Sequence, residues 1–265
     1  MNVFLRELKA HRKSLIFWSI GVFLMVVSGM AKYSAYSSSG QSINELAASL
    51  PKSMRVVLGF NSGDLSKASV YFGMLYLYLL LMATIHAAML GAAIFAKEER
   101  DKTFEFLFAK PVSRTAIITA KLLAVLVNIV IFNLVTFISS VILVGQYNKG
   151  ESVNGEIAVL MIGMFILQLL FMVIGSAIAA VKKKPKTAAS LATGILLITY
   201  LLSIIVDLND HIEPLKYLTP FKYFEAKNIM SGSGLDAVYI ILASSLIIAL
   251  TAVTYVFYKK RDLNV

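Results

Sequence analysis

Residues 157–181 read IAVLMIGMFILQLLFMVIGSAIAAV and contain no charged side chain. A helix needs about 20 mostly apolar residues to cross the hydrocarbon core of a bilayer, so this stretch is long enough to span one. Five further stretches have the same character: 15–33, 70–96, 116–144, 187–206 and 236–258. The sequence therefore predicts an all-α integral membrane protein with six transmembrane helices.

The composition supports this class. Charged residues make up 15% of the 265 positions, against about 25% in soluble domains, and 58% of the residues are hydrophobic. The chain has no cysteine, which excludes disulfides and cysteine-based metal sites. Its net charge of +10 does not indicate nucleic acid, because the basic residues cluster at the ends of the apolar runs.

The distribution of basic residues predicts the orientation. With the N-terminus in the cytoplasm, sixteen of the 25 Lys and Arg residues fall in the inner segments, which are also the shorter ones. The positive-inside rule then places both termini in the cytoplasm. The first span also resembles a signal peptide, but its removal would leave five spans and disrupt this charge pattern, so we expect a retained span.

Several chemistries are missing from the sequence. It has no phosphate-binding loop, no H-E-x-x-H and no G-x-S-x-G motif, so we expect no enzyme activity in this chain. The ionisable residue well inside an apolar run is His86, which we interpret as a packing residue hydrogen-bonded across helices, with a proton relay as the alternative. A membrane transporter that lacks a nucleotide-binding motif is expected to take the energy for transport from a partner protein.

The inner loop at 97–114 reads KEERDKTFEFLFAKPVSR. Its charged half is expected to continue the second span as a helix, Pro111 stops that helix, and Ser113 is placed to cap the third span. Between them lies an apolar cluster: Phe104, Phe106, Leu107 and Phe108. The loop is either an interfacial helix with aromatics in the headgroups or a helix that docks on a cytoplasmic partner.

This loop resembles the signature of permease subunits of ATP-binding-cassette exporters, type-2 permease family. The positions that match the family pattern are Glu98, Glu99, Arg100, Thr103, Phe104, Glu105, Phe106, Leu107, Pro111, Val112, Ser113 and Arg114. The N-terminal segment, which alternates apolar and basic residues, and the sequence LTPFKYF at 218–224 are also similar to that family.

The resemblance implies a single permease domain over 1–265, with three segments of special role. Residues 1–14 would form an amphipathic connecting helix at the inner interface, 97–115 the coupling loop, and 207–235 an outer segment that is either re-entrant or an ordinary amphipathic loop. The expected ATPase-coupling residues are Glu98, Glu99, Arg100, Thr103, Phe104, Glu105, Phe106, Leu107, Lys110 and Pro111. The expected outer-gate residues are Pro220, Phe221, Tyr223 and Phe224.

The resemblance also implies partners and a pathway. A separate cytoplasmic ATPase subunit, in two copies, would bind ATP and Mg. A second permease, either an identical copy as in a homodimer or a paralogue, would complete the pathway in a prokaryotic plasma membrane. Neither cofactor nor metal is expected in this chain. The expected pathway residues, whose alternative role is hydrogen bonding between helices, are Asn128, Asn133, Thr136 and Gln168.

The expected cargo is an amphipathic or hydrophobic molecule: a peptide, an antimicrobial or a lipid-like compound. The small residues Ala83, Ala87 and Gly91 recur every four positions and predict close helix packing, within one subunit or at a dimer seam. Two other functions are kept open. One is a stand-alone secondary transporter, and the other is an immunity or sensor protein that binds a ligand without transporting it.

Overall fold

A computed structural model describes residues 2–38, 42–60, 63–101, 112–148, 153–182 and 187–260. Within these ranges, six helices are long and apolar enough to cross a membrane, which confirms the predicted architecture. They are α1 (Val3–Ser38), α4 (Ala68–Arg100), α6 (Arg114–Tyr147), α7 (Asn154–Val181), α8 (Ala188–Leu208) and α10 (Ala237–Lys260). The described residues contain no strand.

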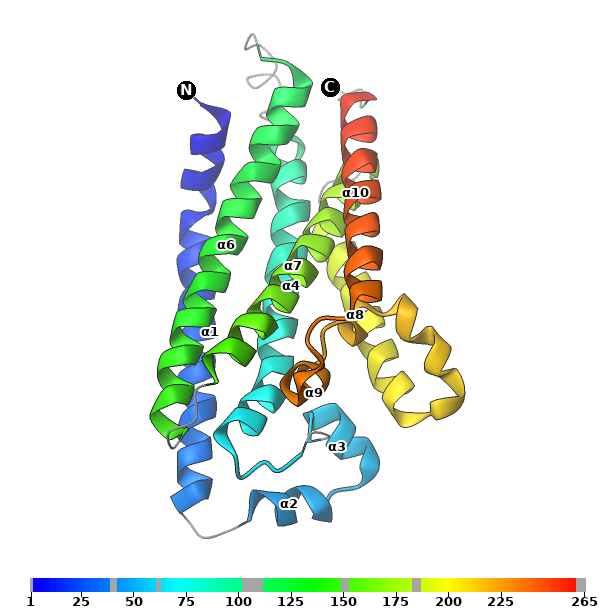
Figure 1. The fold of residues 1–265 in the computed structure, drawn as a ribbon. Helices are drawn as coiled ribbons and strands as arrows, with labels where there is room; N and C mark the ends of the chain where they lie inside the picture. The colour runs from blue at the N-terminus through cyan, green and yellow to red at the C-terminus, as the bar shows by residue number, and fades with distance from the viewer. Residues whose placement is uncertain are drawn as a thin grey trace.

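The six helices form an upright bundle with both ends of the chain at the same end, here called the terminal end (Figure 1). Helices α4 and α7 lie at the centre, and most of their apolar length is buried by the other helices. By contrast, α1, α8 and α10 leave large apolar side chains exposed, including Phe17, Ile198 and Ile248. Such surfaces are stable when lipid covers them.

Close approach of α4 and α7 depends on two glycines. A Cβ atom added at Gly91 would overlap the backbone of Met172, and one at Gly175 would overlap the carbonyl of Ala88. Ala83 and Ala87 on the same face of α4 are fully buried. The small-residue pattern is therefore used for packing within one chain, as the first of the two interpretations predicted.

The first helix corrects one expectation. Residues 3–14 do not form a separate helix, because α1 runs without a break from Val3 to Ser38. No proline or glycine interrupts the chain before Gly21, and the Asn2 side chain accepts a hydrogen bond from the Phe4 amide at the start of the helix. At about 1.5 Å per residue, α1 is about 54 Å long and extends well beyond a 30 Å hydrocarbon core.

At the opposite end, here called the distal end, α2 (Ile43–Ser49) and α3 (Lys52–Leu58) cross beneath the bundle (Figure 1). Ser42 caps α2 by accepting a hydrogen bond from the Glu45 amide, and Gly59, at φ +76°, ends α3. The Asn44 side chain then bonds to Asp64, which fixes the loop after Gly59 onto α2.

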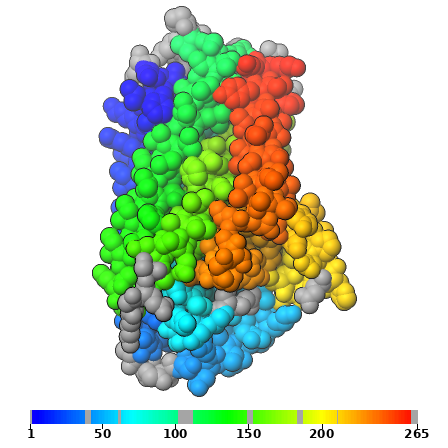
Figure 2. Space-filling model, viewed as in Figure 1, coloured from blue at the N-terminus to red at the C-terminus, as the bar shows by residue number. Residues whose placement is uncertain are grey.

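The second distal segment joins α8 to α10 through short helices: η2 (Asp210–Leu218), η3 (Pro220–Lys222), α9 (Ala226–Asn228) and η4 (Ile229–Ser233). Figure 2 shows that the first part, in yellow, projects from the side of the bundle, whereas the orange part lies against it. A Cβ at Gly73 would lie 2.8 Å from the Met230 sulfur, so this glycine leaves room for the segment to pack on α4.

Candidate functional site

An ion pair buried at the terminal end joins α4 to α6. The ammonium of Lys121 lies 2.6 Å from a carboxylate oxygen of Glu98, and both side chains have almost no exposed surface. Lys121 also donates a hydrogen bond to the carbonyl of Ile94. A buried lysine is tolerated where an anion and further acceptors compensate its charge, and this arrangement supplies both.

The first helix joins the same cluster. Arg6 contacts Glu98 at 3.0 Å and Glu7 at 2.7 Å, and Lys97 lies 3.4 Å from the other oxygen of Glu7. Glu7 is fully buried. These ion pairs hold the first turns of α1 against the last turns of α4. Together, Arg6, Glu7, Lys97, Glu98 and Lys121 form what we call the charged joint.

The charged joint lies at both ends of the predicted coupling segment. Helix α4 ends at Arg100, and α6 begins at Arg114 after Ser113, whose hydroxyl accepts a hydrogen bond from the Ala116 amide, which confirms the predicted cap. Arg114 also donates to the Lys259 carbonyl near the end of α10. The remaining coupling residues lie outside the described ranges: Thr103, Phe104, Glu105, Phe106, Leu107, Lys110 and Pro111.

Of the four polar residues expected to line a pathway, Asn133 of α6 and Gln168 of α7 contact each other. Asn133 donates hydrogen bonds to the Gln168 side chain at 3.1 Å and to the Met161 carbonyl at 3.2 Å. Asn128 and Thr136 are buried and donate to carbonyls of their own helix. The Asn133–Gln168 bond fits the hydrogen-bonding alternative, and the pathway role of all four residues stays a prediction.

His86 of α4 is buried between two aromatic rings. Its ring centroid lies 5.3 Å from that of Trp18 in α1 and 5.1 Å from that of Phe132 in α6. Neither ring nitrogen has a hydrogen-bond partner among the described residues. The expected hydrogen bond across helices is therefore wrong, because the flanking side chains are aromatic, but the expected packing role agrees with the contacts.

The four residues expected at an outer gate are buried in the protein. Phe224 packs on Gly163 of α7, where an added Cβ would lie 2.8 Å from the Phe224 Cβ. The Tyr223 hydroxyl donates to the Tyr217 carbonyl at 2.6 Å, and Pro220 and Phe221 are also buried. Burial, followed by the neighbouring Tyr239, raises the pKa of Tyr223 to about 12. Irregular backbone can enter a membrane where protein buries it, so the re-entrant interpretation stays a prediction.

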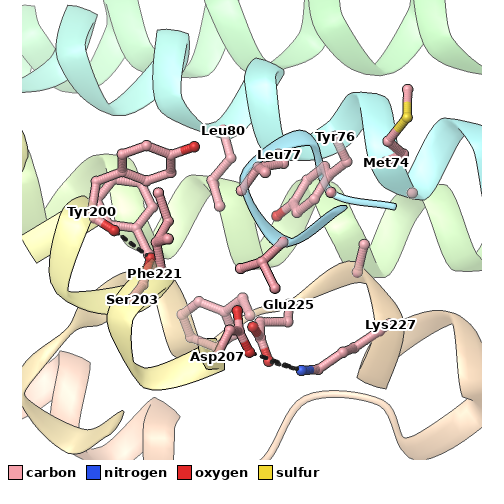
Figure 3. A pocket seen from close by; sticks show the side chains of 16 residues that line it. Met74, Tyr76, Leu77, Leu80, Tyr200, Ser203, Asp207, Phe221, Glu225 and Lys227 are labelled. Carbon is pink, nitrogen blue, oxygen red and sulfur yellow. Dashed lines mark hydrogen bonds and ion pairs between the residues drawn. The ribbon is translucent and has the colours of Figure 1, made fainter. Parts of the chain in front are cut away.

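A cavity of about 80 Å³ opens beside these aromatic residues, which we call the distal pocket. Leu77 and Leu80 of α4 form one wall, and Tyr200 and Phe221 form another (Figure 3). Since a cavity of about 150 Å³ suffices for a benzene ring, the distal pocket can take a short apolar group rather than a whole molecule.

Ionic side chains surround the mouth of the distal pocket. Asp207, at the end of α8, and Glu225 are each paired with Lys222 and with Lys227. Asp207, Glu225 and Lys227 line the pocket directly, with their charged groups close together (Figure 3). These pairs attach the segment around η3 and α9 to α8.

The sequence of this bundle matches one known family along nearly its whole length. A family model described as ABC-2 family transporter protein matches residues 1–263. The chain belongs to this family. None of the curated proteins compared with it matches.

Membership in the ABC-2 family establishes the class of the protein. The family consists of membrane subunits of ABC transporters, which are not themselves catalytic and which work with an ATPase subunit. This ABC-2 chain is therefore a multi-pass membrane subunit of such a transporter, and the resemblance carried by residues 98–114 is confirmed.

Of the charged joint in this ABC-2 chain, only Glu98 is among the site residues expected from the sequence. The other four members were missed: Arg6, Glu7, Lys97 and Lys121. One signal was present, because a lysine within an apolar run needs a counter-ion. Glu98, which lies near the end of α4, is that counter-ion.

Proposed function

We propose that this ABC-2 chain is the permease subunit of an exporter in a prokaryotic plasma membrane, with both termini in the cytoplasm. Two copies of a separate cytoplasmic ATPase subunit bind ATP and Mg, and a second copy of the permease completes the pathway. The cargo is an amphipathic or hydrophobic molecule such as a peptide, an antimicrobial or a lipid-like compound.

The charged joint is the observation that carries this proposal. It ties together the two helices that flank residues 102–111, and it adds α1 through Arg6 and Glu7. A force applied to that segment by an ATPase would therefore act on α1, α4 and α6 as one body. The hydrogen bond from Arg114 to Lys259 extends the connection to α10. Rigid-body motion of this kind is one way in which a bound nucleotide switches a transporter.

The orientation rests on charge. The described basic residues near the terminal end include Arg6, Lys97, Arg114, Lys182 and Lys259, and the positive-inside rule makes that end cytoplasmic. The cargo class rests on the buried polar residues of α6 and α7 expected along the pathway, Asn128, Thr136 and Gln168, which carry no charge. A pathway of low charge suits a cargo that is itself largely apolar.

Co-purification with an ABC ATPase tests the coupling. A gene for such an ATPase beside that of the permease is the first choice of partner. The two subunits are expected to purify as a complex, and the variant Glu105→Ala with Phe106→Ala is expected to lose the ATPase while remaining in the membrane. The matched control, Glu213→Ala with Tyr217→Ala at the distal end, should retain it. Equal retention by both double variants would contradict the coupling assignment.

The direction of transport needs a second experiment. In inside-out vesicles that contain both subunits, ATP added outside is expected to drive a fluorescent amphipathic peptide into the lumen. Uptake without ATP would favour a stand-alone secondary transporter, and binding without uptake would favour an immunity or sensor protein.

A further inference from the structure

The two lysines at the mouth of the distal pocket are held unequally. Lys222 has a side chain that is 6% exposed, and it lies 2.6 Å from Glu225 and against Asp207. Lys227 contacts the same carboxylates at 3.2 and 3.6 Å, and its side chain is 40% exposed. Lys222 is thus a fixed counter-ion, whereas Lys227 is a loosely held one.

Lys227 also has space to move into. A second hollow of about 350 Å³ lies on the other side of this lysine, lined by Gly63, Val70 and Met230 among others. Both cavities share Gly73, Ala226 and Lys227, so the wall between them is the short helix α9 resting on α4. Because Lys227 lines both cavities and its side chain is 40% exposed, open space adjoins it away from the two carboxylates.

Departure of the Lys227 ammonium changes the charge balance at the pocket mouth. Asp207 and Glu225 then share the single ammonium of Lys222, which leaves one uncompensated negative charge beside an apolar cavity. A partly buried carboxylate without a partner is costly, so a new cation is favoured there, and an added anion is disfavoured. Burial lowers the pKa of Lys227, but Glu225 and Asp207 outweigh it and raise the pKa, which indicates that this position stabilises positive charge.

We propose that the distal pocket binds an amphipathic cation, whose ammonium or guanidinium group takes the place of Lys227 between Asp207 and Glu225 while its apolar part enters the cavity. Lys227 occupies the cation site when the ligand is absent. The inference rests on the proposed function in taking this ligand as the exported cargo. It narrows the cargo class to molecules that carry a positive charge next to a short apolar group, such as a basic peptide or a cationic lipid-like compound.

Binding to the permease alone, in nanodiscs without an ATPase, tests this proposal independently of transport. The probes are hexylammonium, hexanol and hexanoate, which share the same chain, and an acetylated Leu-Lys amide, which represents a peptide source. We expect the two cations to bind and hexanol and hexanoate to bind at least tenfold more weakly. Tighter binding of hexylammonium would identify the cargo as a cationic lipid-like compound, and tighter binding of the Leu-Lys amide would identify it as a basic peptide.

Three variants locate the site. Lys227→Gln removes the competing ammonium and is expected to tighten hexylammonium binding about tenfold, whereas Glu225→Gln, which leaves Asp207 to compensate Lys222, is expected to weaken it about tenfold. Lys216→Gln removes a partly exposed lysine that pairs with Glu213 outside the pocket, and it should bind like the unmodified chain. Thermal unfolding of each variant confirms that it is folded.

Two outcomes would overturn the inference. Equal binding of all the six-carbon probes would show simple partitioning into lipid, and preferred binding of hexanoate that is lost in Lys227→Gln would make Lys227 an anion site. Either outcome would leave the proposed export function standing, since ATPase co-purification and ATP-driven uptake are measured separately. Conversely, if the permease binds the cations but no ABC ATPase co-purifies with it, the site is upheld and the exporter function is refuted.

Discussion

Glu98 of α4 and Lys121 of α6 form a 2.6 Å ion pair that is almost completely buried, and the two residues are not equally compensated. Glu98 has a second cation, Arg6, at 3.0 Å. Among the described residues, Lys121 has no second carboxylate within ion-pair distance, and its other partner is the Ile94 carbonyl. Loss of the carboxylate should therefore be the more damaging change.

The first prediction uses this asymmetry. Glu98→Gln leaves the Lys121 ammonium buried without an anion and is expected to lower the free energy of unfolding by about 3 kcal/mol. Lys121→Met leaves Glu98 paired with Arg6, and the expected loss is about 1 kcal/mol. The double variant should be more stable than Glu98→Gln alone. Chemical unfolding in detergent measures all three, and equal losses that add in the double variant would contradict the pairing.

The second prediction concerns the contact between α4 and α7. Gly91→Ala places a methyl group against the Met172 backbone, which cannot move as a side chain can, and the expected loss in unfolding free energy is about 2 kcal/mol. Gly194→Ala in α8 is the matched control, because no heavy atom lies within 4 Å of its added Cβ, and it should change stability by less than about 0.5 kcal/mol. Equal melting temperatures of the Gly91→Ala and Gly194→Ala variants would show that α4 and α7 are not in close contact.

The architecture was predictable because its signals are local. An apolar run such as 157–181 has to be a spanning helix whatever surrounds it, since the backbone must satisfy its own hydrogen bonds in lipid. The same holds for Ser113, whose position after Pro111 and before an apolar run indicates a helix cap. The family signature at 98–114 is also contiguous, so one short stretch carried the assignment.

The contacts that shape the site depend on residues far apart in the chain. Arg6 of α1 and Glu98 of α4 form an ion pair although they lie 92 residues apart in the chain, and residues 3–14 continue α1 as one helix. Similarly, the aromatic neighbours of His86 come from α1 and α6. Neither relationship has a signal in the local sequence.

The third prediction concerns pH at the distal end. Hydrogen bonds from the Asn44 side chain and from Ser66 lower the pKa of Asp64 to about 2. Since the unfolded value is higher, near 4, the stability that these bonds give is present above pH 4 and is lost as the pH falls through about 2. Pepsin should therefore cleave the loop after Gly59 slowly at pH 4 and rapidly at pH 2, relative to an unstructured peptide.

Asp64→Asn provides the control for this pH effect. The variant has no titrating group at position 64, so its cleavage relative to the peptide should be the same at both pH values. Asn44→Ala should speed cleavage at pH 4, because it removes the bonds to Asp64 and to the Leu65 amide. A pH-dependent rate in Asp64→Asn would assign the effect to another group.

The fourth prediction separates packing from proton transfer at His86. Phenylalanine has a similar shape and no ring nitrogens, and both nitrogens of His86 lack a hydrogen-bond partner among the described residues. His86→Phe is therefore expected to raise the unfolding free energy by up to about 1 kcal/mol and to keep ATP-driven uptake. His86→Gln places an unpaired amide between Trp18 and Phe132 and should lower stability by about 2 kcal/mol. If His86→Phe folds normally but abolishes uptake, the imidazole carries protons and the packing interpretation is wrong.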